Sequence, residues 1–214
     1  MNMVTAQTLP PATPQQPRRW RRRLLWGAVA LLALLAAAYF FLTGPRDLAS
    51  YPTRESSPYK LPFPAGQTWL CGQSNRGIVS HRGAGEFAFD FMMPEGSDVC
   101  AARAGVVTAV LVSHDGHGLK APNNYIAITH GDGTSGWYLH LRKDGSLVRV
   151  GERVEQGQRI AKSGHVGRSL APHLHFSVRD DARRTTIPVS FADVSEQAGV
   201  PRMGFHYTSG NLGQ

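Results

Sequence analysis

Two hydrophobic patterns divide the chain. Residues 24–42, LLWGAVALLALLAAAYFFL, form an apolar run of nineteen residues without a charge. After residue 60 the apolar residues instead form short segments, rich in β-branched and aromatic side chains and separated by Gly, Asp or Asn turns. These segments are EFAFDFMM, GVVTAVLVS, NYIAITH, SGWYLHL, SLVRVGERV and HLHFSVRD. The two patterns predict one long helix followed by an all-β, mostly antiparallel domain over residues 61–195.

The apolar run has the length of a membrane span. A helix rising about 1.5 Å per residue nearly crosses the hydrocarbon layer of about 30 Å over this distance. The sequence RRWRRR at 18–23 precedes the run, and the positive-inside rule places that end in the cytoplasm. We therefore predict a cytoplasmic tail (1–23), a single transmembrane anchor (24–42) in the cytoplasmic (inner) membrane and a linker (43–60), with the remainder exported to the periplasm or outside. A cleaved signal peptide ending near residues 36–38 is the alternative, although the apolar run continues beyond those alanines.

The net charge of +8 is concentrated before the predicted span. Five arginines lie at 18–23 and residues 1–44 contain no acid, so the chain without those arginines carries only +3. A nucleic-acid-binding domain needs a basic patch interleaved with aromatic residues on its folded part, and the sequence shows none. We predict that the protein does not bind nucleic acid.

Export makes the two cysteines, Cys71 and Cys100, candidates for a disulfide bond. The alternative is that Cys100, within SDVCAARAGVV, is a small buried apolar residue. Because a disulfide depends on geometry that the sequence does not give, both interpretations stay open.

The segment APHLHFSV, residues 171–178, places two histidines one residue apart. Side chains alternate between the faces of a strand, so His173 and His175 share one face and Leu174 points to the other. A hydrolytic zinc site needs about three His, Asp or Glu ligands and an open position for water. Asp90, in FAFDFMM, is a candidate because a carboxylate among apolar residues must be hydrogen-bonded, ion-paired or metal-bound.

Two further histidines are candidates for the same site. His81 lies nine residues before Asp90, in the glycine-containing loop VSHRGAGE. His140 lies in WYLHL, and strand alternation places Tyr138 on the same face.

In this order, the segments resemble the LytM (lysostaphin-type) zinc metallopeptidases, which cut peptide bonds in bacterial peptidoglycan. The resemblance covers roughly residues 80–180 and is carried by FDFMMPEGSDVCAARAGVV, NNYIAITHGDG, WYLHL, VGERVEQGQRIAKSG and GRSLAPHLHFSV. It implies a β-sandwich of the duplicated-hybrid-motif, barrel-sandwich-like type over residues 61–195, followed by a C-terminal tail (196–214). It also implies one zinc ion as cofactor.

The resemblance implies a role for each candidate. Asp90 and His175 would be zinc ligands, while His140 and His173 would stay unligated and act on substrate and water. Zinc would lower the pKa of its bound water to about 7 and polarise the scissile carbonyl. The two free histidines would stabilise the oxyanion and move the proton to the leaving amine.

The chain departs from the family pattern at the first ligand. The family has a histidine four residues before the aspartate, and Glu86 occupies that position here. We predict His81 as the third ligand, because histidine is a common zinc ligand and glycines at 83 and 85 allow the loop to fold back. Ligation by Glu86, and a domain that holds no metal and only binds, are the alternatives.

Four further residues are candidates for binding the substrate peptide: Tyr138, Asn124, His165 and Arg168. For the three loop residues, hydrogen bonds within turns are the alternative.

The function predicted by this resemblance is a membrane-anchored, exported zinc metalloendopeptidase acting on peptidoglycan peptides. The alternative is a non-catalytic domain of the same fold that recruits or activates another cell-wall hydrolase. The predicted partners are peptidoglycan peptides and, through the N-terminal helix, the membrane; unidentified proteins of the division or cell-wall machinery are further candidates.

Overall fold

The computed structural model describes residues 19–43, 48–77 and 79–212. Helix α1 (Arg19–Thr43) contains the apolar run. Within the part of the chain that is described, no helix is both long enough and apolar enough to cross a membrane. Most of the predicted cytoplasmic tail (residues 1–18), the side chains of residues 39–43 at the end of the predicted span, and residues 44–47 of the linker lie outside the described residues.

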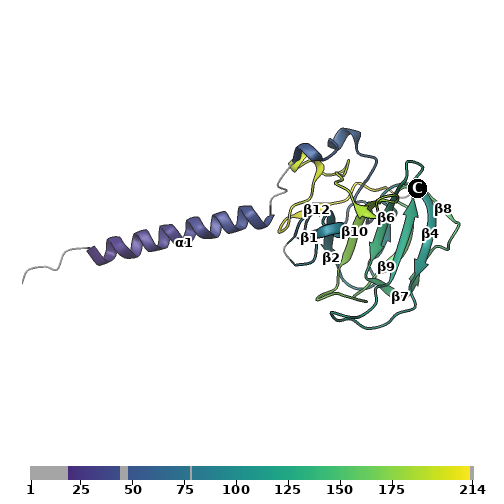
Figure 1. Cartoon of the computed structure of the whole chain (residues 1–214), viewed down its shortest axis with the longest axis horizontal. Coiled ribbons are helices and arrows are strands. Elements are labelled where there is room, and N and C mark those ends of the chain that lie inside the picture. Colours follow the sequence, from purple (N-terminus) through teal and green to yellow (C-terminus); the bar gives the residue numbers. More distant parts are fainter. Residues whose placement is uncertain (1–18, 44–47, 78, 213–214) are drawn as a thin grey trace, which may run out of the picture. The chain divides into compact units, whose positions relative to one another are not determined.

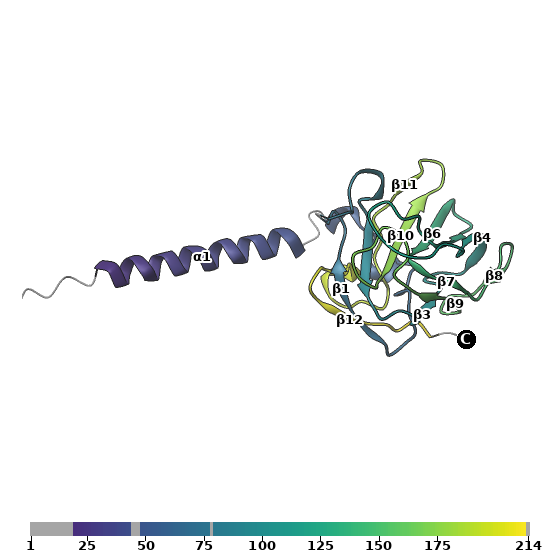
Figure 2. The same ribbon diagram turned by 90° about the horizontal axis from the view of Figure 1, so that it is seen from below.

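Two antiparallel sheets make up the domain that follows (Figures 1 and 2). Among the described residues, the larger sheet has nine strands in the order β12-β1-β2-β10-β6-β5-β4-β8, with β11 paired to β10. The smaller sheet has the order β3-β9-β7. The all-β, mostly antiparallel prediction is therefore confirmed for the domain.

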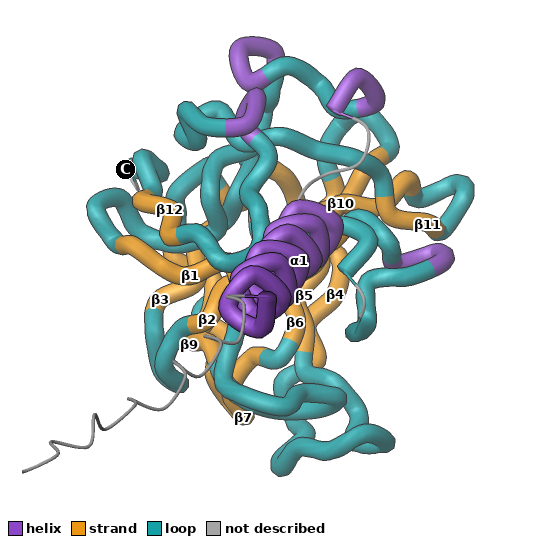
Figure 3. The backbone as a smooth tube through the Cα atoms, turned by 90° about the vertical axis from the view of Figure 1, so that its left-hand side faces the viewer, coloured by secondary structure: helices purple, strands orange, loops and turns teal. Residues whose placement is uncertain are grey.

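The strands are short and joined by turns and loops (Figure 3). They are β1 (Thr68–Gln73), β2 (Ala88–Met92), β3 (Asp98–Cys100), β4 (Gly105–Leu111), β5 (Tyr125–Thr129), β6 (Thr134–Leu139), β7 (Leu141–Ser146), β8 (Arg153–Val154), β9 (Arg159–Ser163), β10 (Leu174–Asp180), β11 (Thr185–Thr186) and β12 (His206–Thr208). Apart from α1, the described helices are single 3-10 turns: η1 (Leu48–Ser50), η2 (Arg54–Ser56), η3 (Gly83–Gly85) and η4 (Gln197–Gly199).

Strand alternation builds an aromatic core on one face of the larger sheet. In β10, Leu174, Phe176 and Val178 are fully buried, as the two-residue period of a strand requires. Phe91 of β2 packs edge-on against Phe63, with ring centroids 5.3 Å apart, and Phe89 packs in the same way against Phe191 at 5.2 Å. Edge-to-face contacts at these distances are favourable for aromatic rings.

The register of the central strands aligns three polar side chains. Gln73 of β1 pairs with Asp90 of β2, and Asp90 in turn pairs with His175 of β10. Because paired residues point to the same face, all three lie on the side of the sheet opposite the aromatic core. A row of three polar side chains thus crosses three neighbouring strands.

Both ends predicted to lie outside the domain are part of it. In the predicted C-terminal tail (196–214), β12 pairs with β1 and Tyr207 is buried. In the predicted linker (43–60), Ser57 donates a hydrogen bond to the Ser190 carbonyl and Arg54 donates one to the Ala192 carbonyl. The boundaries at 60 and 195 therefore need correction, because pattern analysis passed over one short strand and an irregular segment.

Cys71 and Cys100 are both buried and unbonded.

Candidate metal centre and active site

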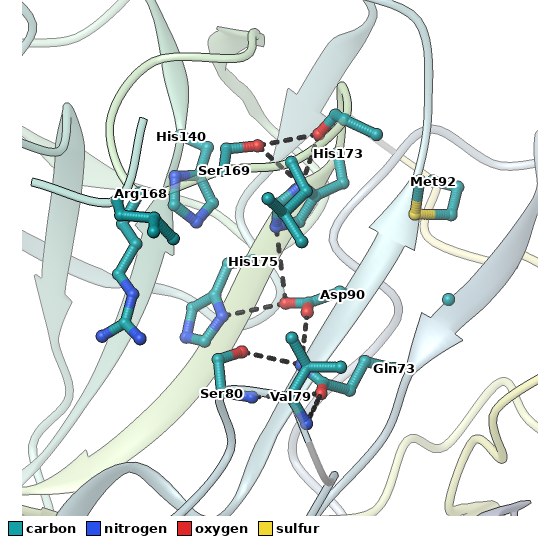
Figure 4. Close-up of a pocket in the computed structure, with 14 residues that line it drawn as sticks. Gln73, Val79, Ser80, Asp90, Met92, His140, Arg168, Ser169, His173 and His175 are labelled. Carbon is teal, nitrogen blue, oxygen red and sulfur yellow. Dashed lines mark hydrogen bonds and ion pairs between the residues drawn. The ribbon is translucent and has the colours of Figure 1, made fainter. Parts of the chain in front are cut away.

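Three of the predicted residues converge on one point. The possible ligand atoms of His81, Asp90 and His175 all lie within 4.8 Å of one another. Asp90 Oδ1 lies 3.1 Å from His81 Nε2 and 2.9 Å from His175 Nδ1. Figure 4 shows the Asp90 carboxylate between His175 and Gln73. Asp90 and His175 are brought together by the pairing of β2 with β10, and His81 reaches them from the loop between β1 and β2.

The contact between His81 and Asp90 requires a positive charge. His81 Nδ1 donates a hydrogen bond to the Ser74 carbonyl at 2.8 Å, which leaves a lone pair on Nε2. That lone pair faces a carboxylate oxygen, so a proton or a metal ion must lie between the two atoms. Burial lowers the pKa of His81, but the contact with Asp90 outweighs burial and the pKa is raised.

The Asp90 carboxylate is held as an anion. Burial by itself would raise the pKa of Asp90, but the hydrogen bonds from His175 and His81 hold it well below its ordinary value. Its second oxygen, Oδ2, accepts a hydrogen bond from Gln73 Nε2 at 2.9 Å. The sequence prediction missed Gln73, whose role becomes visible only when β1 is placed beside β2.

These three residues fit a divalent metal ion. Zinc in hydrolytic sites takes three protein ligands, commonly histidine nitrogens and a carboxylate, and keeps one position open. His81 is fixed by its bond to a backbone carbonyl, which is the arrangement that orients metal-binding histidines. An ion bound here would replace the proton that the contact between His81 and Asp90 otherwise requires.

His140 and His173 form a second pair beside this cluster. Their ring centroids are 4.5 Å apart, and each is nearly buried. His140 Nδ1 donates to the Val166 carbonyl at 2.9 Å, and His173 Nδ1 donates to the Ala171 carbonyl at 2.8 Å. In both rings Nε2 is therefore left free of the backbone, and His173 Nε2 lies 3.7 Å from Asp90 Oδ1. Burial and the neighbouring imidazoles lower the pKa of His140 to about 3.

The backbone at His140 departs from strand geometry and corrects one prediction. His140 has φ of 64°, a left-handed conformation that non-glycine residues seldom adopt. It lies between β6 of the larger sheet and β7 of the smaller one, where the chain changes sheets. This turn directs the His140 ring to the site. Tyr138 instead stays fully buried in the core, where its hydroxyl accepts a hydrogen bond from the Ala102 amide at 2.8 Å. The expectation that Tyr138 and His140 share a face, with Tyr138 binding substrate, is therefore wrong.

The structure separates the two candidates for the third ligand. His81 is 1% exposed and contacts Asp90, whereas the Glu86 carboxylate pairs with Arg76 Nε at 3.2 Å. Glu86 follows the 3-10 turn η3 (Gly83–Gly85), which lies in the same loop as His81. The five additional residues between histidine and aspartate are thus accommodated by the loop, and Glu86 is not part of the cluster of possible ligands.

Two of the candidate substrate contacts have structural partners instead. Asn124 is fully buried, accepts a bond from the His114 amide and donates to the carbonyls of His114 and Leu141. His165 stacks on His117, with ring centroids 3.8 Å apart, and does not line the pocket at the site. The prediction that these two residues contact the substrate is not supported, because the Asn124 side chain is held by hydrogen bonds within the loop and the His165 ring stacks on His117.

Arg168 does line the pocket. The pocket has a volume of about 210 Å³ and is also lined by Asp90, His140, His173 and His175. Arg168 is exposed and makes no ion pair with any residue of the described chain. Figure 4 shows its side chain beside His140. Three exposed apolar side chains also line the pocket: Val79, Leu119 and Leu170.

Comparison with known proteins gives a consistent set of matches. Residues 85–187 match the model of "Peptidase family M23". An "Uncharacterized metalloprotease" of Haemophilus influenzae is 32% identical over 139 residues, which is 64% of this chain and 26% of that protein. "Peptidoglycan DD-endopeptidase ShyA" of Vibrio cholerae is 40% identical over 100 residues, 47% of this chain and 21% of that protein. This chain therefore matches only about a fifth to a quarter of the length of these two relatives.

Solved structures of similar proteins include lysostaphin from Staphylococcus simulans. It is 31% identical to this chain, with a TM-score of 0.45, and the match covers 56% of this chain and 47% of that one.

Proposed function

Residues 85–187 match peptidase family M23, and on this premise we propose that the chain is a zinc metalloendopeptidase acting on bacterial peptidoglycan. The observation that carries the proposal is the convergence of His81, Asp90 and His175 within 4.8 Å, beside two histidines with free Nε2 atoms. The related ShyA is named as a peptidoglycan DD-endopeptidase, which supports the substrate class.

In this proposal the chain's own residues divide the work of hydrolysis. His81 Nε2, Asp90 Oδ1 and His175 Nδ1 would hold the zinc ion, which supplies Lewis acidity and a water of pKa about 7. His140 and His173 present Nε2 to the pocket, where one imidazole takes a proton from the attacking water and returns it to the leaving amine. The other imidazole, when protonated, donates a hydrogen bond to the oxyanion.

Arg168 supports a contact with the substrate. It lies on the pocket wall and has no ion-pair partner among the described residues, and its backbone amide is fixed by a hydrogen bond to Asn123 Oδ1 at 2.8 Å. Guanidinium groups recognise carboxylates through paired N–H donors. We propose that Arg168 binds a carboxylate of the stem peptide, with the exposed Leu119 and Leu170 contacting its aliphatic parts.

We also propose that the apolar run 24–42, whose last four side chains lie outside the described residues, anchors the enzyme in the cytoplasmic membrane, with the domain exported. The support is the uncharged run 24–42 preceded by five arginines. Membrane fractionation followed by alkaline carbonate extraction tests this proposal. Retention of the full-length chain in the membrane pellet is expected, whereas a shortened soluble product would indicate a cleaved signal peptide.

Digestion of purified peptidoglycan by the full-length protein in detergent tests the enzymatic proposal. We expect new peptide termini to appear, their release to stop with a chelator and to return when zinc is added. Digestion unaffected by the chelator would reject the metal mechanism. If no cleavage occurs but the protein stimulates another wall hydrolase, the non-catalytic alternative would be favoured.

A further inference from the structure

Gln73 has every hydrogen-bonding position of its side-chain amide occupied. Nε2 donates to Asp90 Oδ2 at 2.9 Å and to Ser80 Oγ at 2.8 Å. Oε1 accepts from the Val79 amide at 3.0 Å and from the Ser80 amide at 3.3 Å. A primary amide has two donors and one oxygen with two acceptor positions, so this arrangement is complete.

The orientation of this amide is fixed by its partners. The two backbone amides can only donate, so Oε1 must face them, and Nε2 must then face the carboxylate. Gln73 is 6% exposed, which limits competition from water. Gly77 makes the close approach possible, because a Cβ at that position would lie 2.3 Å from Gln73 Cγ.

Gln73 connects the two sequence regions that meet at the site. Val79 and Ser80 directly precede His81, while Asp90 lies on the neighbouring strand. The residue after Gln73, Ser74, supplies the carbonyl that fixes the His81 ring. One side chain and the adjacent carbonyl therefore hold both the loop carrying His81 and the carboxylate that His81 faces. Figure 4 shows Gln73 beside Asp90, Val79 and Ser80.

We propose that Gln73 is a positioning residue for the metal centre, and that it allows a histidine nine residues before Asp90 to serve as a ligand. The inference rests on the proposed metal role of His81 and Asp90. Gln73 itself does not contact the ion: it orients Asp90 through Oδ2, so that Oδ1 faces the histidines, and it fixes the backbone before His81. Partners that orient metal ligands typically change metal affinity by about 10- to 100-fold when they are removed.

The test measures zinc affinity of the full-length protein in detergent, by competition with a chromophoric chelator. Gln73→Met keeps a similar length and removes all four hydrogen bonds, and we expect affinity to fall by about 10- to 100-fold. Gln67→Met is the matched control: among the described residues the Gln67 side chain accepts a single 3.3 Å bond, from Trp69, and the zinc affinity of this variant should equal that of the wild type. Cobalt(II) substitution should give an altered visible spectrum for Gln73→Met and an unaltered one for the control.

Two further variants separate positioning from general stability. Ser80→Ala removes one of the four bonds and should weaken zinc binding by about 2- to 10-fold while the chain stays folded. In the His81→Ala background, Gln73→Met should cost much less affinity than in the wild type, because its effect passes through His81 and Asp90. Additive losses in this cycle, or wild-type affinity for both Gln73→Met and Ser80→Ala, would overturn the inference.

The outcomes also distinguish this inference from the proposed function. A wild-type protein that binds zinc with Gln73-dependent affinity but cleaves no peptidoglycan would retain the inference and reject the enzymatic activity. If the protein cleaves peptidoglycan in a zinc-dependent reaction but its zinc affinity does not depend on Gln73, the enzymatic activity would be retained and the inference rejected. A wild-type protein that binds no zinc would overturn both.

Discussion

The two groups of side chains at the site are held in different ways. His81, Asp90 and His175 contact one another through a single carboxylate oxygen, so their positions depend on a shared positive charge. His140 and His173 are each fixed by a backbone carbonyl through Nδ1 and leave Nε2 free. The first arrangement is suited to holding a cation and the second to exchanging a proton. Substitutions in the two groups should therefore have different consequences.

Asp90→Ala should have the largest effect. It removes the oxygen that both His81 and His175 contact, so we expect loss of bound zinc and of all detectable peptidoglycan cleavage. Metal analysis of the purified variant and the digestion assay measure the two effects. Asp98→Ala is the control. The Asp98 carboxylate lies outside the site and pairs with Lys162 at a distance of 2.6 Å, so this variant should retain both zinc and cleavage. If Asp90→Ala retained zinc, His81, Asp90 and His175 would not be the group that holds the metal ion.

His173→Ala and His140→Ala should have the next largest effect on activity. Each removes an imidazole Nε2 but none of the hydrogen bonds that hold His81, Asp90 and His175, so zinc content should stay unchanged while kcat falls by about 100-fold or more. His206→Ala, at an exposed position on β12, is the control and should keep full activity. Loss of zinc in either variant would mean that the two groups do not act separately.

The pH dependence of stability should reveal a histidine outside both groups. His130 is buried, donates to the Ala104 carbonyl at 2.9 Å, and its Nε2 has no partner among the described residues. Burial lowers the pKa of His130 in the folded chain. Below about pH 6.5, His130 therefore binds a proton in the unfolded chain while it stays neutral in the folded chain. Stability should then fall with decreasing pH, by at most about 1.4 kcal/mol per pH unit from this residue.

Urea unfolding of the wild type and of His130→Gln at pH 7 and pH 5 measures this contribution. The variant should lose less stability between the two pH values than the wild type does. Equal losses would show that His130 does not contribute to the acid sensitivity of the fold.

Glu86→Gln should have the smallest effect. Its carboxylate is about one-third exposed and pairs with Arg76 alone among the described residues, and such surface pairs contribute about 0–1 kcal/mol. We expect unchanged zinc affinity and activity, whereas His81→Ala should bind zinc far more weakly than the wild type. If Glu86→Gln released the ion and His81→Ala kept it, the glutamate would have to replace the histidine in the first group.

Part of this site could be predicted from the sequence because it depends on strand periodicity. The alternation of HLHFSV placed Leu174 in the core and His175 on the opposite face, and the apolar neighbours of Asp90 indicated a buried carboxylate that needs partners. The antiparallel β fold followed from the same pattern of short strands. These are local properties, and a single sequence carries them directly.

The parts that failed depend on non-local contacts or on single backbone angles. The left-handed φ of His140 breaks the alternation that would have placed it beside Tyr138, and no residue type in WYLHL signals it. Gln73 acquires its role only through the pairing of β1 with β2. Likewise, β12 is three residues long, and its pairing with β1 is what makes the C-terminal segment part of the domain.

Zinc K-edge X-ray absorption on the purified full-length protein tests the central claim most directly. The account predicts one zinc ion per chain, with two imidazole nitrogens and oxygen ligands at about 2.0–2.2 Å. In His81→Ala and His175→Ala the imidazole contribution should fall or the ion should be lost. A wild-type spectrum without histidine scattering, or a protein that takes up no zinc at all, would contradict the account.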